Sequence, residues 1–174
     1  MVFPSQLPEA LLDSVYEVAT RALQALGVTT GATHTELKLT PDGPQVIEIN
    51  GRLGGDVGRL VELSTGIHGV ELALRAVCGL AVTAPRPTAV AGVSMLVPPI
   101  EATSLASRVP AAALRAVEGV VAIDVHSRQG DAVDYRTGWW AHVACVWYRA
   151  DDWQRLSDTH TAAHAVADAE LTWK

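Results

Sequence analysis

The chain has 174 residues, about one average domain, and its 49% hydrophobic and 18% charged content excludes an intrinsically disordered protein. Its formal net charge of −6 argues against a nucleic-acid partner, because proteins that bind nucleic acids carry a basic footprint. No apolar run approaches the roughly 20 residues that cross a bilayer, and the chain opens without a basic-then-apolar leader, so we expect a cytoplasmic protein with no membrane partner.

The first predicted element is a helix over residues 9–26. Apolar residues recur there at three- and four-residue spacing, which is typical of an amphipathic helix. Pro8 suits the first turn of such a helix, and Gly27 suits its end. Residues 1–8 show no internal pattern, so we predict no element before this helix.

Two β-strands are predicted on either side of the turn at residues 41–44, because Asp-Gly and flanking prolines are turn residues while both flanks alternate. Side chains along a strand point to opposite faces in turn. Ile47 and Ile49 therefore share one face of the second strand, while three polar side chains share the other: Glu48, Asn50 and Arg52.

Glu36 and Lys38 share one face of the first strand, opposite its two leucines. A register that buries these leucines with the isoleucines of the second strand brings Glu36 towards Glu48. Two carboxylates and the amide oxygen of Asn50 at short range repel one another unless a hard cation lies among them. Mg²⁺ takes such oxygen ligands and often links carboxylates to nucleotide phosphates.

Arg52 offers a planar guanidinium suited to a phosphate or a carboxylate. Gly54 and Gly55 allow a close approach of the backbone where we predict that a helix begins at Asp56. His34, two residues before Glu36, either reaches the same site or only bonds to the neighbouring loop.

Two helices are predicted next, over residues 56–65 and 70–77, and we expect both to pack behind the hairpin. The clearest linker follows at residues 84–87, where two prolines prevent a helix or a strand from continuing. We therefore divide the chain into a domain at residues 1–83, the linker at 84–87, and a smaller α+β subdomain at 88–174.

The second half is predicted to contain three strands and two helices. The strands lie at residues 89–97, 120–125 and 139–147, and the helices at 110–116 and 151–173. Its five tryptophans are expected mainly in the core, with one of Trp139 and Trp140 facing a partner. Cys78 and Cys145 are expected to be buried thiols, and His160 with His164 has the spacing of a helical zinc pair but no evident third ligand.

The motif of Glu36, the run Glu-Ile-Asn-Gly-Arg at residues 48–52, and Gly54-Gly55 resembles the magnesium-binding end of the ATP-grasp fold. Within that superfamily it is most similar to carboxylate–amine ligases of the L-amino-acid (dipeptide) ligase type. The resemblance implies an α+β fold: a C-terminal ATP-grasp lobe, with an antiparallel sheet and flanking helices, followed by a small α+β subdomain.

The resemblance also implies roles for the motif residues. Glu36, Glu48 and Asn50 would hold Mg²⁺ (or Mn²⁺) against the phosphates of ATP, and Arg52 would be catalytic by steadying an acyl phosphate. Substrate contacts are expected at His34, Arg52, Gly54 and Gly55. The implied reaction joins a carboxylic acid to an amine or amino acid at the cost of ATP.

ATP-grasp enzymes hold the nucleotide between two lobes, and we expect this chain to lack the preceding lobe. That lobe would be a separate chain or the remainder of a longer protein. Two alternatives stay open: a non-catalytic truncated ATP-grasp module that binds a partner or forms a homo-oligomer, and a metal-binding domain that does not use ATP.

Overall fold

The computed structural model describes residues 1–84 and 86–174, apart from the side chain of Trp139. Internal contacts divide the chain into two compact units. We call Pro4–Pro87 the N-terminal unit, and Met1–Phe3 together with Thr88–Lys174 the C-terminal unit. The linker predicted at residues 84–87 includes Pro85, which lies outside the described residues.

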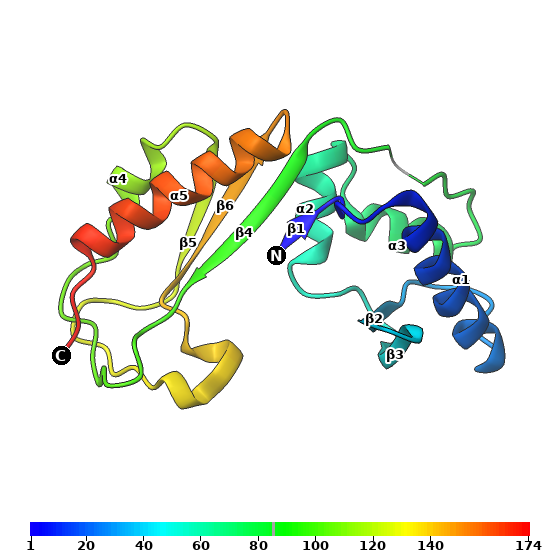
Figure 1. Cartoon of the computed structure of the whole chain (residues 1–174), viewed down its shortest axis with the longest axis horizontal. Coiled ribbons are helices and arrows are strands. Elements are labelled where there is room, and N and C mark those ends of the chain that lie inside the picture. Colours follow the sequence, from blue (N-terminus) through cyan, green and yellow to red (C-terminus); the bar gives the residue numbers. More distant parts are fainter. Residues whose placement is uncertain (85) are drawn as a thin grey trace. The chain divides into compact units, whose positions relative to one another are not determined.

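The N-terminal unit contains three helices and a two-stranded sheet, as Figure 1 shows. Its elements are α1 (Glu9–Ala25), β2 (His34–Thr40), β3 (Gly43–Asn50), α2 (Val57–Thr65) and α3 (Gly69–Val77). The predicted stop at Gly27 is confirmed, since Gly27 follows α1 with φ 69°. Gly66 caps α2 with φ 76°, and glycine adopts both of these left-handed conformations without strain.

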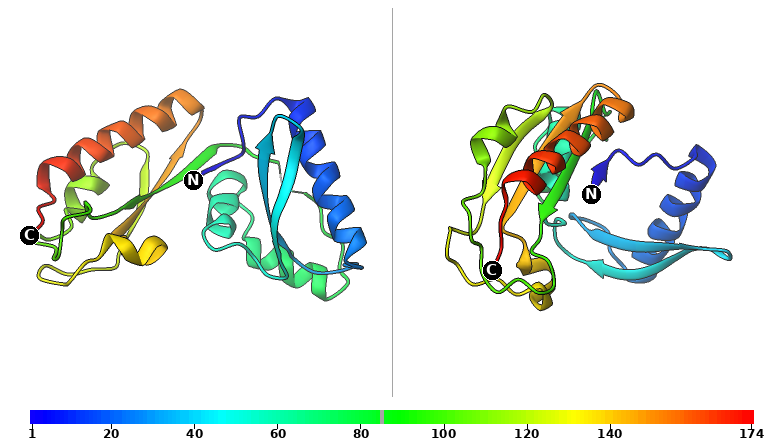
Figure 2. Two further views of the ribbon diagram at one scale, coloured as in Figure 1. Left: turned by 60° about the horizontal axis from the view of Figure 1, so that its bottom comes forward. Right: turned by 60° about the vertical axis from the view of Figure 1, so that its left-hand side comes forward.

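Helix α1 is the helix that packs along the hairpin, whereas we had predicted that α2 and α3 would do so (Figure 2). The other two helices pack mainly on each other. Two glycines allow that approach, because a Cβ on Gly69 would lie 2.9 Å from the Cα of Gly58. The packing of α2 and α3 therefore depends on the absence of side chains at their contact.

The C-terminal unit is a four-stranded antiparallel sheet with helices against it. The strand order is β1-β4-β6-β5, formed by β1 (Val2–Phe3), β4 (Val90–Leu96), β6 (Ala144–Ala150) and β5 (Val120–Val125). The helices α4 (Ala111–Arg115) and α5 (Trp153–Glu170) pack on the sheet, and a short 3₁₀ segment, η1 (Tyr135–Ala141), precedes β6. The predicted α+β class, an antiparallel sheet with flanking helices, is confirmed.

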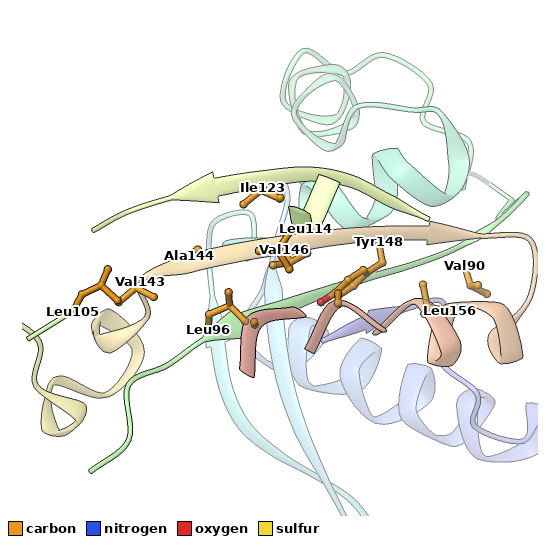
Figure 3. Close-up of a cluster of buried hydrophobic side chains, with 12 residues drawn as sticks. Val90, Leu96, Leu105, Leu114, Ile123, Val143, Ala144, Val146, Tyr148 and Leu156 are labelled. Carbon is orange, nitrogen blue, oxygen red and sulfur yellow. The ribbon is translucent and has the colours of Figure 1, made fainter. Parts of the chain in front are cut away.

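The hydrophobic core lies between this sheet and its helices. Figure 3 shows the labelled side chains of β4 and β6 gathered along the sheet beside α5. Leu114 of α4 and Val146 of β6 are both 0% exposed, and Tyr148 is 2% exposed. Burial raises the pKa of the Tyr148 hydroxyl above its usual value, because the charged phenolate would lose its hydration.

Two predicted elements have other bounds in the structure. The strand expected at residues 139–147 begins only at Ala144, because the preceding segment turns as a 3₁₀ helix with Gly138 at φ 63°. Trp140 on that segment is 81% exposed, whereas Trp147 in β6 is 2% exposed. The last helix ends at Glu170, and Trp173 instead forms a β-bridge with Leu105.

The cysteines differ from the prediction at one position. Neither of the two cysteines, both among the described residues, forms a disulfide, but Cys78 is exposed and only Cys145 is buried. Among the described residues, no helix is long and apolar enough to cross a bilayer.

Candidate functional site

A two-residue connection turns β2 into β3 and fixes the pairing of the half of the hairpin next to it. Thr40 pairs with Gly43, and its hydroxyl donates to the Gly43 carbonyl at 2.9 Å while it accepts the Asp42 amide at 3.3 Å. Gly43 has φ 101°, a conformation that a side chain would strain. The turn predicted from Asp-Gly is therefore present, with Pro41 and Asp42 as its two loop residues.

The register places four polar residues together at one end of the hairpin. Glu36 lies directly opposite Glu48, and His34 lies directly opposite Asn50. Residues two apart on a strand share a face, and so do residues directly opposite each other, so these four side chains lie on one face. The predicted approach of Glu36 to Glu48 is confirmed.

A β-bulge interrupts the pairing just beyond the two glutamates. Leu37 pairs with Val46 instead of Ile47, so Ile47 is an extra residue without a partner on β2. We had predicted that Ile47 would be buried with the leucines, and this prediction was wrong: Ile47 is 63% exposed. The bulge interrupts the alternation of side chains next to the two glutamates. The apolar face of the hairpin is therefore not continuous at that point.

Two buried polar atoms on this face lack a hydrogen-bond partner within the described residues. The His34 Nδ1 lies 3.8 Å from Glu36 Oε1, too far for a hydrogen bond. Both His34 Nδ1 and Asn50 Nδ2 are buried with no hydrogen-bond partner in the described chain. Buried polar atoms are usually paired, so the two orphaned atoms are consistent with a polar ligand at this face.

The donor set fits a magnesium ion. Two directly opposed carboxylates and a neighbouring amide offer the oxygen ligands that Mg²⁺ prefers. Among the residues that the structure describes, no ion pair or side-chain hydrogen bond holds the Glu48 carboxylate. Without a cation, two like charges directly opposite each other destabilise the strand pair.

Gly54 and Gly55 differ in their surroundings. A Cβ at Gly54 would lie 2.7 Å from the His34 ring, so only a glycine lets the loop after β3 lie against that ring. A Cβ at Gly55 would meet nothing within 4 Å. Gly54 therefore positions His34, and Gly55 leaves open backbone just before α2.

Arg52 does not lie on the strand, although we had predicted that it would share the face of Asn50. Strand β3 ends at Asn50, and Arg52 is exposed in the following loop. Its guanidinium donates to the Leu53 carbonyl at 3.0 Å. Its direction is therefore set by the loop and not by strand alternation.

A second group of potential ligands was missed by the sequence analysis. In the C-terminal unit the ligand atoms of His126, His142 and Cys145 lie within 4.8 Å of one another. The two histidines are 16 positions apart in the chain, so only the pairing of β5 with β6 brings them together. The spacing His142-Val-Ala-Cys145 is the one local signal that could have indicated the group.

Comparisons with known proteins give partial matches in sequence and a match over nearly the whole chain in structure. No family model matches the chain. It is 36% identical over 86 residues to the uncharacterized protein y4rH of Sinorhizobium fredii, covering 46% of this chain and 18% of that protein. It is 38% identical over 74 residues to carnosine synthase 1 of Gallus gallus, covering 42% of this chain and 8% of that protein.

Among solved structures, the L-amino acid ligase from Bacillus licheniformis matches with a TM-score of 0.78 at 23% identity. The match covers 99% of this chain and 43% of that ligase, so the chain spans less than half of the ligase's length. These features define an ATP-grasp fold. In particular, the chain has the fold of the C-terminal half of the ATP-grasp ligases.

Proposed function

We propose that this chain is the C-terminal part of an ATP-dependent carboxylate–amine ligase, which makes an amide bond through an acyl phosphate. The observation that carries the proposal is the register of the hairpin, which sets Glu36 against Glu48 and His34 against Asn50 on one face. The match to an L-amino acid ligase supports the class of reaction. The segment shared with the protein named carnosine synthase 1 supports it as well.

The proposed reaction has two steps. A carboxylate oxygen of the acid attacks the γ-phosphorus of ATP, and ADP leaves. The amine nitrogen then attacks the carbonyl carbon of the acyl phosphate, inorganic phosphate leaves, and the nitrogen loses a proton. Neither step needs a nucleophile from the protein, so the protein acts by positioning the reactants and by screening charge.

Glu36, Glu48 and Asn50 are the residues that would hold Mg²⁺ (or Mn²⁺) with ATP in this proposal. When bound, the ion screens the negative charge of the phosphates. The two carboxylates supply the charge that attracts the ion, and the neutral Asn50 amide adds a ligand without further repulsion. His34, held by the loop at Gly54, lies beside Glu36 and would contact the substrate.

Arg52 is assigned to the acyl phosphate or to the substrate carboxylate. Its guanidinium is exposed and donates to a carbonyl of its own loop. On the surface, replacing such a hydrogen bond by one to a ligand costs little. A planar guanidinium binds two oxygens of a phosphate at once. The open backbone at Gly55 would contact the same substrate group.

The nucleotide contacts would be completed by a lobe outside these 174 residues, either in the same polypeptide or in a separate chain. The exposed apolar side chains of the N-terminal unit support such a cover: Tyr16 is 65% exposed, Ile47 63% and Leu74 60%. The same observation favours the alternative function, a non-catalytic module that binds a partner or a second copy.

Calorimetry of ATP binding by the chain mixed with the polypeptide encoded upstream tests the proposal. The mixture should bind ATP only when Mg²⁺ is present, and it should release ADP with a carboxylic acid and an amine. Glu48→Gln should abolish both. Glu101→Gln removes the same charge from an exposed position in the other unit and should change neither.

Three results would separate the alternatives. ATP binding that survives Glu48→Gln contradicts the assignment of the hairpin. A complex of the two polypeptides that never binds ATP establishes the non-catalytic module instead. ADP release by the chain alone would overturn the proposal that a further lobe is needed.

A further inference from the structure

The C-terminal unit holds a group of two histidines and a cysteine that the ligase reaction does not use. The ligand atoms of His126, His142 and Cys145 all lie within 4.8 Å of one another. The two imidazole rings meet edge to face, with centroids 4.7 Å apart. The three side chains thus converge on one point from two neighbouring strands.

The backbone fixes this convergence. His126 directly follows β5, and its amide donates to the Val143 carbonyl at 2.9 Å, which ties it beside the segment that carries His142. Cys145 lies within β6, directly opposite Asp124 of β5. Since Asp124 and His126 are two apart along the chain, both lie on the side of the sheet that carries Cys145.

This side of the sheet is not the side that holds the core. Val146 and Tyr148 face α5 in the hydrophobic core, so the alternating Cys145 and Trp147 face the other way. On that side, the Trp147 indole donates to Asp124 Oδ2 at 2.7 Å. That bond holds the Asp124 carboxylate at Trp147, next to the cysteine.

The chemistry of the group points to a thiophilic metal ion. Two imidazoles and a thiolate suit Zn²⁺, whereas Mg²⁺ prefers oxygen ligands like those of the hairpin. Around tetrahedral zinc, ligand atoms lie about 3.3 to 3.6 Å apart at the usual bond lengths. Ligand atoms that already lie within 4.8 Å reach that spacing by small side-chain rotations.

The three potential ligands differ in burial, and the side of the group at His126 is open to solvent. Cys145 is 5% exposed, His142 is half-buried, and His126 is exposed. A buried thiolate with two more accessible imidazoles leaves a coordination position towards solvent. A site with three protein ligands keeps its fourth position for water or a substrate group.

The helical pair His160 and His164 is a poorer candidate, although its spacing suggested zinc. Its rings lie 4.3 Å apart, but burial, then the His164 charge, then the positive charge of the chain's amino terminus lower the pKa of His160. A neighbouring positive charge disfavours a cation. Among the described residues, only His126, His142 and Cys145 form a group of three such ligands.

We propose that His126, His142 and Cys145 form a Zn²⁺ site with an open fourth position, separate from the magnesium site on the hairpin. The ion takes the place of the thiol proton and links β5 to β6 beyond the end of their regular pairing. Its accessible side makes it a place where a substrate group or a second protein can bind the metal.

Titration of the metal-free full chain with Co²⁺, and then with Zn²⁺ against a chromophoric chelator, tests the proposal. One equivalent of Co²⁺ should bind with the intense tetrahedral visible bands and a thiolate-to-cobalt charge-transfer band. Cys145→Ser should remove the charge-transfer band. His126→Ala should weaken zinc binding at least about tenfold, the loss seen even for residues that only support a ligand.

Three controls accompany the titration. Cys78→Ser changes the other, exposed thiol and should leave the cobalt spectrum unchanged. Glu48→Gln should also leave the cobalt spectrum unchanged. The experiment therefore distinguishes failure of the zinc proposal from failure of the magnesium proposal. Because His126 is exposed, circular dichroism should show His126→Ala folded like the wild type. A cobalt complex without a thiolate band, or one unchanged by Cys145→Ser, would overturn the proposal.

Discussion

The two units of the chain differ in how they are held together. The C-terminal unit has a core of fully buried side chains between its sheet and its helices. The N-terminal unit has much less: α1 contains no buried residue, and Pro44 is the one buried residue of the described hairpin. Yet the glutamate pair of the candidate site lies on the less buried unit.

The difference in buried core between the two units bears on our proposal that the hairpin site needs a further lobe. An isolated two-stranded hairpin is marginally stable in water, and large exposed apolar side chains mark surfaces that other protein covers. This agrees with our proposal that a further lobe completes and stabilises the hairpin site. A site in the C-terminal unit, such as the histidine–cysteine group, is positioned by a core of its own.

Leu114→Ala should destabilise the chain by about 2 to 5 kcal/mol, because Leu114 is 0% exposed and its removal leaves a cavity. The matched change Leu74→Ala affects a side chain that is 60% exposed and should stay within about 0.5 kcal/mol. Urea denaturation followed by circular dichroism measures both. Equal effects would show that the two units do not differ as described.

Gly119→Ala should lower the free energy of unfolding by about 2 kcal/mol or more. Gly119 has φ +86°, and a Cβ there would lie 2.5 Å from the Thr159 hydroxyl. That hydroxyl donates to the Glu118 carbonyl at 3.0 Å, so the substitution adds backbone strain and breaks a hydrogen bond. Gly51→Ala, where a Cβ would meet nothing within 4 Å, should change the unfolding midpoint little. A neutral Gly119→Ala would contradict this account.

Glu48→Gln should stabilise the metal-free chain by about 0.2 to 1 kcal/mol, because it removes a like charge directly opposite Glu36. Mg²⁺ should raise the melting temperature of the wild type but not that of the variant, since only the wild type binds the ion in its folded state. Melting curves in chelator and in Mg²⁺ measure both effects. A variant that loses stability in chelator would show that Glu48 is structural.

Protonation of His160 should slightly lower the stability of the folded chain at acid pH. Its pKa is lowered first by burial, then by the charges of His164 and the chain's amino terminus. The unfolded chain therefore binds this proton at a higher pH, near 6.5, so stability should fall as the pH drops below that value. His160→Gln should reduce this loss. Melting curves across pH 7 to 5 would contradict the account if the variant and the wild type lost stability equally.

Sequence alone predicted the elements whose signals are local. The strand at residues 120–125 has the bounds that its β-branched composition indicated, and the stop at Gly27 follows from the left-handed conformation that glycine allows. Sequence also predicted the approach of Glu36 to Glu48, from the faces on which alternation places the polar residues, although the observed pairing is set by the bulge at Ile47. These features depend on neighbours within a few residues.

The features that sequence did not predict depend on distant partners. Strand β1 has two residues and exists only by pairing with β4, about 90 positions later. The bulge at Ile47 cannot be read from alternation, which it interrupts. The metal-ligand roles of Glu36, Glu48 and Asn50 stay predictions.

The most direct test of the central claim is to locate the divalent ion. Mn²⁺ in place of Mg²⁺ broadens the NMR signals of nearby amides, and it does so even when binding is weak. In the presence of ATP, we predict broadening centred on Glu36, Glu48 and Asn50 that disappears in Glu48→Gln and persists in Glu101→Gln. Broadening centred elsewhere in the chain, or none at the hairpin, would contradict the account.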